Sequence, residues 1–436
     1  MAPDISEGRK APLSLRIAII GGGIGGLSAA YCLAKAGHEV TVFESKDEIR
    51  EAGAGIMATP NVIRLFYRWG LAQKLEAVAQ LDHSEGITTF RHTGELLNEW
   101  PMGEAFEQET GYPTFQLHRA DLINLIHEIA SPLVKLRLGS EITSLDATAP
   151  SVTLKSGETV SADLIVGADG VHSFVRAALG NPQVNKSTGG FAYRYLIPAE
   201  DLLGDPELRS MIDTPGVYIW LGAHKKLVAY GIRGRSILNV AAFLPDDTQT
   251  PDTPTGDLDA LQGAFAGEPW ESRARKIVEL AKSRRLLKWK ILHNEPLDRW
   301  IHPDGPVTLL GDACQVIPPH SGQGAAITIE DAAVLGNLFS RISDRSQIKA
   351  LLQAYQEIRQ PRRTATWLDT MEQTNLIHLP DEEQRRKVPG VPVLGRRKAH
   401  ELTIPIHCSH DFGYDPDEVV DIWWKKGGEG ITAIGD

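Results

Sequence analysis

The first hydrophobic segment of the chain predicts a strand, a tight turn and a helix. A β-branched run at 16–20 enters a glycine-rich turn, and 27–36 has a helix-forming composition that ends at Gly37. The next run, 38–44, predicts a second strand. Together these segments make a β-α-β unit of about the thirty residues that such units need.

A different pattern fills the middle of the chain. Alternating, aromatic-rich runs occur at 191–197, 217–221, 227–232 and 237–243. They predict an antiparallel sheet with one solvated or cavity-facing side. A buried strand returns at 307–310, so we expect the sheet to be inserted into the α/β fold that the first unit begins. Helical spacing then continues to about Ile377.

Composition and charge narrow the function classes. The 436 residues are 42% hydrophobic and 23% charged, as in an ordinary globular protein. A formal net charge of -11 argues against a nucleic-acid partner, because phosphate binding needs clustered cations. Three cysteines, Cys32, Cys314 and Cys408, provide no disulfide framework, so we expect a reducing, cytoplasmic location. Residues 17–34 are uncharged, but the glycines among them argue against a membrane span.

The glycine turn fits a dinucleotide-binding fingerprint. Gly21, Gly23 and Gly26 have the G-x-G-x-x-G spacing, directly after a strand and at the start of a helix. The first permits the tight turn, the second lets backbone N–H groups approach a pyrophosphate, and the third lets the helix pack on the strand. Glu44 ends the second strand, where a carboxylate accepts hydrogen bonds from an adenosine ribose. The fingerprint does not choose between NAD and FAD.

Two distant segments make that choice. Residues 163–176 resemble the second fingerprint of flavoprotein hydroxylases, and 307–313, which include Asp312, resemble their third. With 319–324 and 330–332, they make the chain similar to the class A, single-component FAD-dependent aromatic monooxygenases. The segments 191–198 and 220–234, together with 378–381 and 413–415, are similar to the salicylate-hydroxylase-like members in particular. The resemblance covers nearly the whole chain.

The resemblance implies an α/β fold in which a Rossmann-like FAD-binding domain carries an inserted, mainly antiparallel substrate domain and a helical C-terminal region. The expected boundaries are 1–14 for a flexible tail, 15–188 and 285–345 for the discontinuous FAD-binding domain, 189–284 for the substrate sheet, and 346–436 for the C-terminal helix and tail. It further implies that NADH or NADPH reduces a tightly but non-covalently bound FAD. Oxygen then adds at the flavin C4a position, and the hydroperoxide hydroxylates a phenolic, salicylate-like or indolic ring.

The fingerprint and the resemblance together predict the site residues. Those expected to bind the cofactor are Gly21, Gly23, Gly26, Glu44, Gly55, Arg119, Asp169, Asp312, Gly324 and Ala325. Asp312, at the end of a buried strand, can hold a ribityl hydroxyl, and the helix that begins near Gly324 directs its positive end at the reduced flavin. Those expected to be catalytic are Arg194 and Tyr230 from the sheet, and Pro319 and His320 on the flavin's reactive face.

Several of these residues also have a structural explanation that needs no ligand. Asp312 can instead cap a helix, and Arg119 can form a surface salt bridge. Arg194 and Tyr230 can be ordinary half-buried residues of a sheet. Gln315 stands where many members of the family carry a histidine, so no role for that histidine transfers to this chain.

Other functions also stay open. The same motifs fit a flavoprotein dehydrogenase or reductase that uses no oxygen, an alkene epoxidase, or a protein that only retains FAD. No metal is expected, because the H-C-x-H stretch at 407–410 lacks the paired ligands of a zinc site. The sequence leaves a homo-oligomer open.

Overall fold

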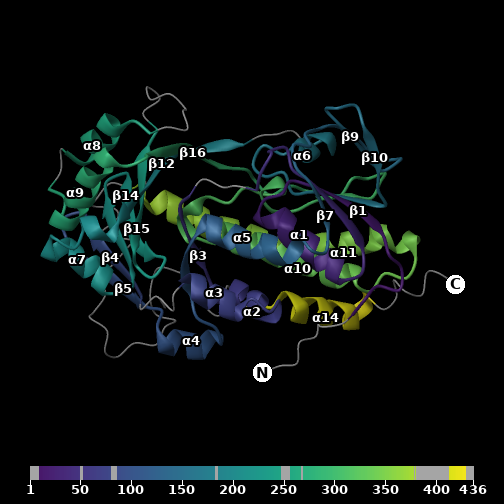
Figure 1. Cartoon of the computed structure of the whole chain (residues 1–436), viewed down its shortest axis with the longest axis horizontal. Helices are drawn as coiled ribbons and strands as arrows, with labels where there is room; N and C mark the ends of the chain where they lie inside the picture. The colour runs from purple at the N-terminus through teal and green to yellow at the C-terminus, as the bar shows by residue number, and fades with distance from the viewer. Residues whose placement is uncertain are drawn as a thin grey trace.

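The structure is a computed structural model that describes residues 9–49, 53–79, 86–181, 185–246, 256–266, 269–377, 379 and 412–428. A parallel sheet with its helices occupies one end of an elongated molecule, and a larger sheet occupies the other (Figure 1). Residues 1–8 of the expected tail and the H-C-x-H stretch lie outside the described residues.

The predicted β-α-β unit is confirmed as the centre of a five-stranded parallel sheet. Its strands stand in the order β17-β11-β1-β2-β7. Their bounds are β1 Arg16–Ile20, β2 Glu39–Phe43, β7 Lys135–Arg137, β11 Leu164–Gly167 and β17 Val307–Leu309. Because β1 pairs with β11 and β11 pairs with β17, segments that lie far apart in sequence stand side by side in this sheet.

Helices and a small sheet cover this parallel sheet. The hydrophobic core joins its strands to the helices α1, α10 and α11 and to the strand β9. The bounds of these elements and their neighbours are α1 Ile24–Lys35, α2 Pro60–Arg68, α3 Ala72–Ala79, α5 Arg119–Ala130, α6 Phe174–Ala178, α10 Gly324–Phe339, α11 Ile348–Ile377, β3 Gly55–Ala58, β6 Phe115–His118, β8 Ile142–Asp146, β9 Ser151–Leu154 and β10 Thr159–Ser161.

The predicted antiparallel sheet is confirmed and has seven strands, in the order β16-β12-β15-β14-β13-β4-β5. Their bounds are β4 Gly86–Arg91, β5 Leu96–Pro101, β12 Lys186–Pro198, β13 Val217–Gly222, β14 Lys225–Ile232, β15 Ile237–Pro245 and β16 Leu287–His293. All neighbours run antiparallel except β13 and β4. The sheet thus takes 86–101 and 287–293 from outside the range 189–284.

The two faces of the seven-stranded sheet have different partners. One face packs its aromatic and aliphatic side chains against α7 Pro206–Asp213, α8 Leu258–Ala266 and α9 Ser272–Glu279. The opposite face contacts β3 and the short turn η4 Pro319–Ser321. We call this second face the inner face, because it looks toward the parallel-sheet end.

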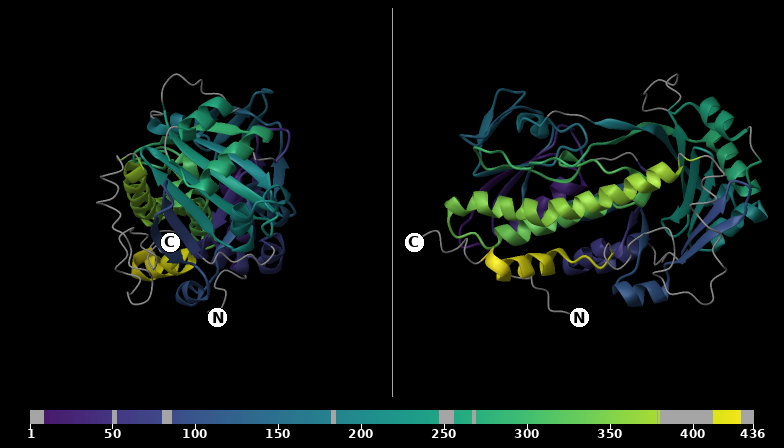
Figure 2. Two further views of the ribbon diagram at one scale, coloured as in Figure 1. Left: turned by 90° about the vertical axis from the view of Figure 1, so that its left-hand side faces the viewer. Right: turned by 180° about the vertical axis from the view of Figure 1, so that it is seen from behind.

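The C-terminal part of the chain ties the two ends together. The helix α11 runs along the length of the molecule, and α14 Pro416–Gly427 lies beside α10 and α11 (Figure 2). The predicted helical region up to about Ile377 is confirmed, since α11 ends there.

Across the described part of the chain, no helix has the length and apolar character that a membrane crossing needs. The short remaining elements are α4 Glu104–Thr110, η1 Ala199–Asp201, η2 Leu280–Ser283, η3 Gly311–Ala313 and η5 Arg345–Gln347.

Candidate functional site

The carboxyl edge of the parallel sheet gathers most of the predicted cofactor residues. Ile20 is the register partner of both Phe43 and Gly167, and Gly167 pairs with Leu309. The glycine turn, Glu44, Asp169 and Asp312 follow these four positions by one to three residues, so they emerge side by side. Ligands of open parallel sheets bind at this edge.

The glycine turn has the shape that a pyrophosphate needs. Gly21 has φ +105°, and a Cβ on it would lie 2.4 Å from the carbonyl oxygen of Ala168. A Cβ on Gly26 would lie 1.9 Å from the carbonyl oxygen of Gly21, so both positions accept only glycine. A Cβ on Gly23 would meet nothing within 4 Å, which leaves the open side from which a phosphate can approach the helix N-terminus.

Two predicted carboxylates hold the loops of this edge. Glu44 accepts hydrogen bonds from the backbone N–H of Gly22 at 2.7 Å and of Lys46 at 2.9 Å, so it stands directly beside the glycine turn. Asp169 accepts from the Ser173 hydroxyl at 2.5 Å and from the backbone N–H of Val175 at 3.1 Å. Burial raises the pKa of Asp169, although these donors oppose the shift. Its carboxylate therefore fixes the start of α6.

Asp312 and Arg119 form a half-buried electrostatic group at the same edge. The Asp312 side chain is 39% exposed, and Arg363 Nη2 lies 4.0 Å from its Oδ1. Burial raises the pKa of Asp312, while Arg363 and Arg119 act against that shift. Burial lowers the pKa of Arg119, and the negative charge of Asp312 opposes this. Within the described residues no backbone N–H donates to the Asp312 carboxylate, so the structure provides no support for the capping alternative.

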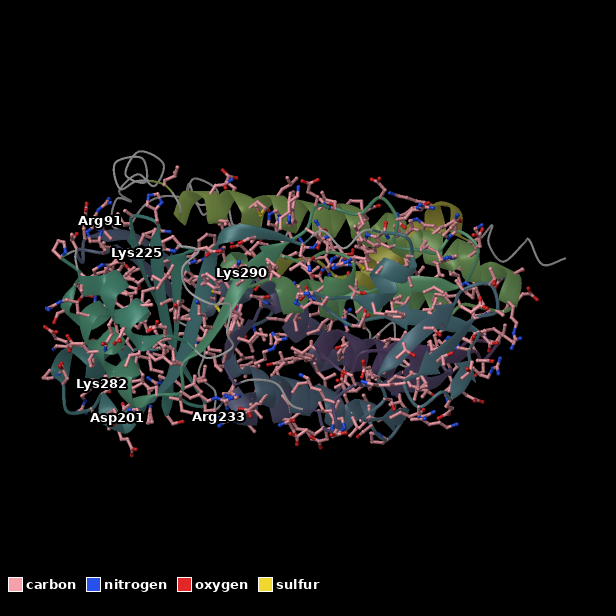
Figure 3. The ribbon with its side chains drawn as sticks, turned by 90° about the horizontal axis from the view of Figure 1, so that it is seen from above. Arg91, Asp201, Lys225, Arg233, Lys282 and Lys290 are labelled. Carbon is pink, nitrogen blue, oxygen red and sulfur yellow. The ribbon has the colours of Figure 1, made fainter. Side chains whose placement is uncertain are left out.

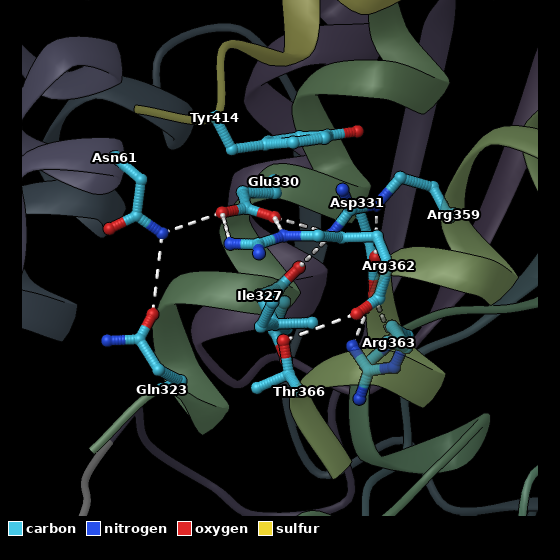
Figure 4. A network of polar contacts seen from close by, with 12 residues as sticks. Asn61, Gln323, Ile327, Glu330, Asp331, Arg359, Arg362, Arg363, Thr366 and Tyr414 are labelled. Carbon is cyan, nitrogen blue, oxygen red and sulfur yellow. Dashed lines mark hydrogen bonds and ion pairs between the residues drawn. The ribbon is translucent and has the colours of Figure 1, made fainter. Parts of the chain in front are cut away.

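A buried ionic network anchors α10, whose first residues are the predicted Gly324 and Ala325. Figure 4 shows Glu330 and Asp331 facing three arginines of α11, Arg359, Arg362 and Arg363. Arg359 donates to both carboxylates at 2.8 Å, and Arg363 Nη1 donates to Asp331 at 2.6 Å.

The same network reaches the loops of the carboxyl edge. Asp331 accepts from the backbone N–H of Gly311 at 3.2 Å, next to Asp312. Glu330 accepts from Asn61 Nδ2 at 2.6 Å, and Asn61 also contacts Gln323 at the entry to α10. Tyr414 lies over Arg359 and Arg362 with ring-to-guanidinium distances of 4.9 and 4.8 Å. The C-terminal helices thus set the position of α10 and of the loop that carries Asp312.

The inner face of the large sheet closes the site from the other side. Arg194 Nη1 donates to the carbonyl oxygen of Gly55 at 3.0 Å, and the Gly55 N–H donates to Asn239 Oδ1 at 2.7 Å. A Cβ on Gly55 would lie 2.7 Å from the Tyr230 hydroxyl oxygen. Arg194, Tyr230 and Gly55 are therefore together, as the sequence predicts. The guanidinium of Arg194 also stacks on Trp289, 5.2 Å from the ring centroid.

This cluster has polar atoms to offer a ligand. Arg194 Nε and Asn239 Nδ2 are buried and have no hydrogen-bond partner among the described residues. Burial raises the pKa of Tyr230 to about 12, and the charge of Arg194 opposes the shift. Tyr230 therefore keeps its proton at neutral pH and can donate it in a hydrogen bond.

Pro319 and His320 reach the inner face from the parallel-sheet end. They form η4, and the Ser321 hydroxyl, which follows them, accepts from Thr370 of α11 at 2.7 Å. The His320 ring packs on Phe243 of β15 with 4.8 Å between centroids. The structure thus brings all four predicted catalytic residues to the junction of the two sheets.

Sequence reasoning missed Asn239, Trp289 and the α11 arginines. Arg359, Arg362 and Arg363 have the i, i+3, i+4 spacing that places side chains on one helix face, which could have revealed them. Asn239 and Trp289 carry no such signal, because their roles depend on the register of β15 and β16. In the described residues no group of three candidate metal ligands is present.

The fold and the carboxyl-edge site are those of a dinucleotide-binding protein, and comparisons with known proteins specify the class further. Residues 14–369 match the family model described as FAD binding domain. The chain is 34% identical over 419 residues to the FAD-dependent monooxygenase OpS4 of Beauveria bassiana (strain ARSEF 2860), covering 93% of this chain and 96% of that protein. It is 32% identical to the 3-amino-4-hydroxybenzoate 2-monooxygenase PtmB3 of Streptomyces platensis, covering 85% and 90%.

A solved structure agrees at the level of the fold. A salicylate hydroxylase substrate complex superposes with a TM-score of 0.71 at 23% identity, covering 94% of this chain and 98% of that one. The chain therefore belongs to the family of FAD-binding monooxygenases, as its resemblance predicted. This outcome supports the oxygen-using interpretation and not the alternative of an oxygen-independent dehydrogenase.

Proposed function

We propose that this enzyme uses NADH or NADPH and O₂ to hydroxylate a small aromatic molecule of phenolic, salicylate-like or indolic type. The observation that carries the proposal is the junction of the two sheets, where Arg194 and Tyr230 stand beside Gly55 and His320 packs on Phe243 of the same inner face. Relatives named as acting on hydroxybenzoates support the aromatic class.

The cofactor residues fit FAD, and we assign their roles accordingly. Gly21, Gly23 and Gly26 would admit the pyrophosphate at the start of α1, while Glu44 would accept from the adenosine ribose. Asp312 would hold the ribityl chain, with Arg119 beside it. The start of α10 at Gly324 and Ala325 would place its positive end near the isoalloxazine. Bound FAD supplies the redox chemistry that transfers an oxygen atom to the ring.

The residues of the inner face would bind and orient the substrate. Tyr230 would donate a hydrogen bond to a phenolate or carboxylate oxygen, and Arg194 Nε would supply a second, charged donor. A cation beside a phenol lowers the phenol's pKa, which makes the ring richer in electrons and easier to oxygenate. Pro319 and His320 line the opposite side and help to exclude water.

Coupling measurements test this assignment. Arg194→Met and Tyr230→Phe should retain FAD and still oxidise NAD(P)H, but they should yield less hydroxylated product per NAD(P)H and more hydrogen peroxide. Tyr195→Phe is the matched control, because Tyr195 lies on the helix-covered face and donates to the Ile277 carbonyl at 3.1 Å. Unchanged coupling in both inner-face variants would remove them from the catalytic assignment.

The remaining features of the proposal concern setting and assembly. We propose a cytoplasmic enzyme, because the sequence has only three cysteines and the two that are described, Cys32 and Cys314, are free. A relative crystallised as a tetramer supports a homo-oligomer, which light scattering of the purified enzyme would test. We propose that FAD is released unmodified on denaturation, since the described cradle is made of hydrogen-bond and backbone contacts; covalent flavin in the denatured chain would refute this.

A further inference from the structure

Lys226 is a buried ammonium on the inner face of the large sheet. The residue is only 8% exposed, and its Nζ atom lies 5.6 Å from the centroid of the Phe243 ring. That ring also packs on His320, so Lys226 stands one aromatic ring away from a predicted catalytic residue. Register pairs Lys226 with Phe243 and Leu221, both of which are apolar.

No acidic side chain in the described part of the chain forms an ion pair with Lys226. Burial lowers its pKa to about 8, and no neighbouring charge contributes to this shift. A buried charge without a counter-ion costs several kcal/mol unless something compensates it, and residues in such surroundings gather at functional sites. Lys288, the other deeply buried lysine of this sheet, lies on the helix-covered face against Phe191 at 4.0 Å.

The spacing of Lys226 and Tyr230 along β14 sets the length of a ligand that contacts both residues. The two residues are four positions apart on β14 and therefore point to the same face, about 13 Å apart along the strand. Figure 3 shows Lys225 and Arg233, which flank these positions, at separate ends of the sheet. Between them the inner face presents the apolar residues Val228, Ala241 and Phe243.

We propose that Lys226 binds a carboxylate carried at the far end of an elongated aromatic substrate, whose phenolic end lies at Arg194 and Tyr230. The apolar strip between the two ends matches the faces of two linked rings, and the anion supplies the missing counter-charge. Lys226 is thus a specificity-determining residue that selects long aromatic acids over short or neutral phenols. This inference rests on the proposed function, because it takes the inner face as the substrate site.

Ligand binding to the oxidised, FAD-loaded enzyme tests this without turnover. The probes are 4′-hydroxybiphenyl-4-carboxylate, its methyl ester and 4-phenylphenol, titrated by the change in the flavin absorption spectrum. The wild type should bind the acid on the order of tenfold more tightly than either neutral probe, as a charge-assisted hydrogen bond predicts. Equal affinity for the acid and the ester in the wild type would overturn the proposal without the need for any variant.

Variants then test whether Lys226 causes the preference for the acid. Lys226→Met should lose the preference for the acid while binding 4-phenylphenol as before, and Lys226→Arg should largely keep it. Lys288→Met removes a buried ammonium from the other face of the same sheet, so it should leave the preference intact. A preference that persists in Lys226→Met, or disappears equally in Lys288→Met, would refute the assignment.

Product analysis separates this inference from the proposed function. If the acid preference depends on Lys226 but no probe or other aromatic compound yields an oxygenated product, aromatic hydroxylation fails and the carboxylate site stands. If hydroxylated products form without any acid preference, the function stands and the role of Lys226 is refuted.

Discussion

The network around Asp331 permits a quantitative prediction. Its carboxylate is fully buried and accepts from Arg359 Nε at 2.8 Å, Arg363 Nη1 at 2.6 Å and the Gly311 N–H at 3.2 Å. In Asp331→Ala the two guanidiniums stay buried; Arg359 keeps Glu330, which it shares with Arg362, and Arg363 keeps Asp312 as an acidic partner, 4.0 Å away. Removing one partner of a buried pair costs about 3–5 kcal/mol, and we expect a loss within that range because two cations lose their shared anion.

Urea unfolding of the FAD-free protein, followed by tryptophan fluorescence, measures this cost. The matched control is Asp213→Ala, which removes one partner of an exposed ion pair with Arg209 and should cost less than about 1 kcal/mol. Asp331→Ala should also lower FAD affinity, because the Gly311 N–H that it releases adjoins Asp312. An unfolding midpoint like that of the control would show that the arginines find other compensation, and the reasoning would be wrong.

Three further predictions concern the cofactor edge. Gly23→Ala should lower FAD affinity but change the unfolding free energy of the apoprotein by less than about 0.5 kcal/mol, because its Cβ faces open space. Gly26→Ala should lower both the FAD affinity and the unfolding free energy, because its Cβ would lie 1.9 Å from a backbone oxygen. Glu44→Ala should weaken FAD binding by about 1.5–3 kcal/mol in an isothermal titration, and an unchanged affinity would reject the ribose role. Asp312→Ala should impair FAD retention far more than apoprotein stability; collapse of stability with normal affinity would favour a structural role.

The cofactor edge was predictable from sequence because its physics is local. A turn that only glycine can form, flanked by a β-branched strand and a helix, fixes Gly21, Gly23 and Gly26 within six residues. Buried runs before Asp169 and Asp312 then identify neighbouring parallel strands, and parallel strands bring their carboxyl ends to one edge. The register of the strands, in which Ile20, Gly167 and Leu309 are aligned, confirms this reasoning.

The full set of strands in the large sheet could not be predicted from the sequence. Alternation identified four of its strands, but β4 and β5 join it through a parallel pairing of β4 with β13, more than a hundred residues along the chain. No local pattern encodes such a pairing, because it depends on how the two ends of the molecule pack. The same holds for Asn239, whose value lies in facing Gly55 across the junction.

The two ends of the molecule are joined through the residues that we propose as the reactive centre. Both backbone polar groups of Gly55 are bonded to the large sheet, the N–H to Asn239 and the carbonyl to Arg194. Gly55 begins β3, which pairs with β6, and β6 leads directly into Arg119 beside Asp312. A displacement of the inner face therefore acts on the cofactor edge through a few hydrogen bonds. Because Arg194 serves both this link and the proposed substrate, substrate binding has a short structural route to the flavin.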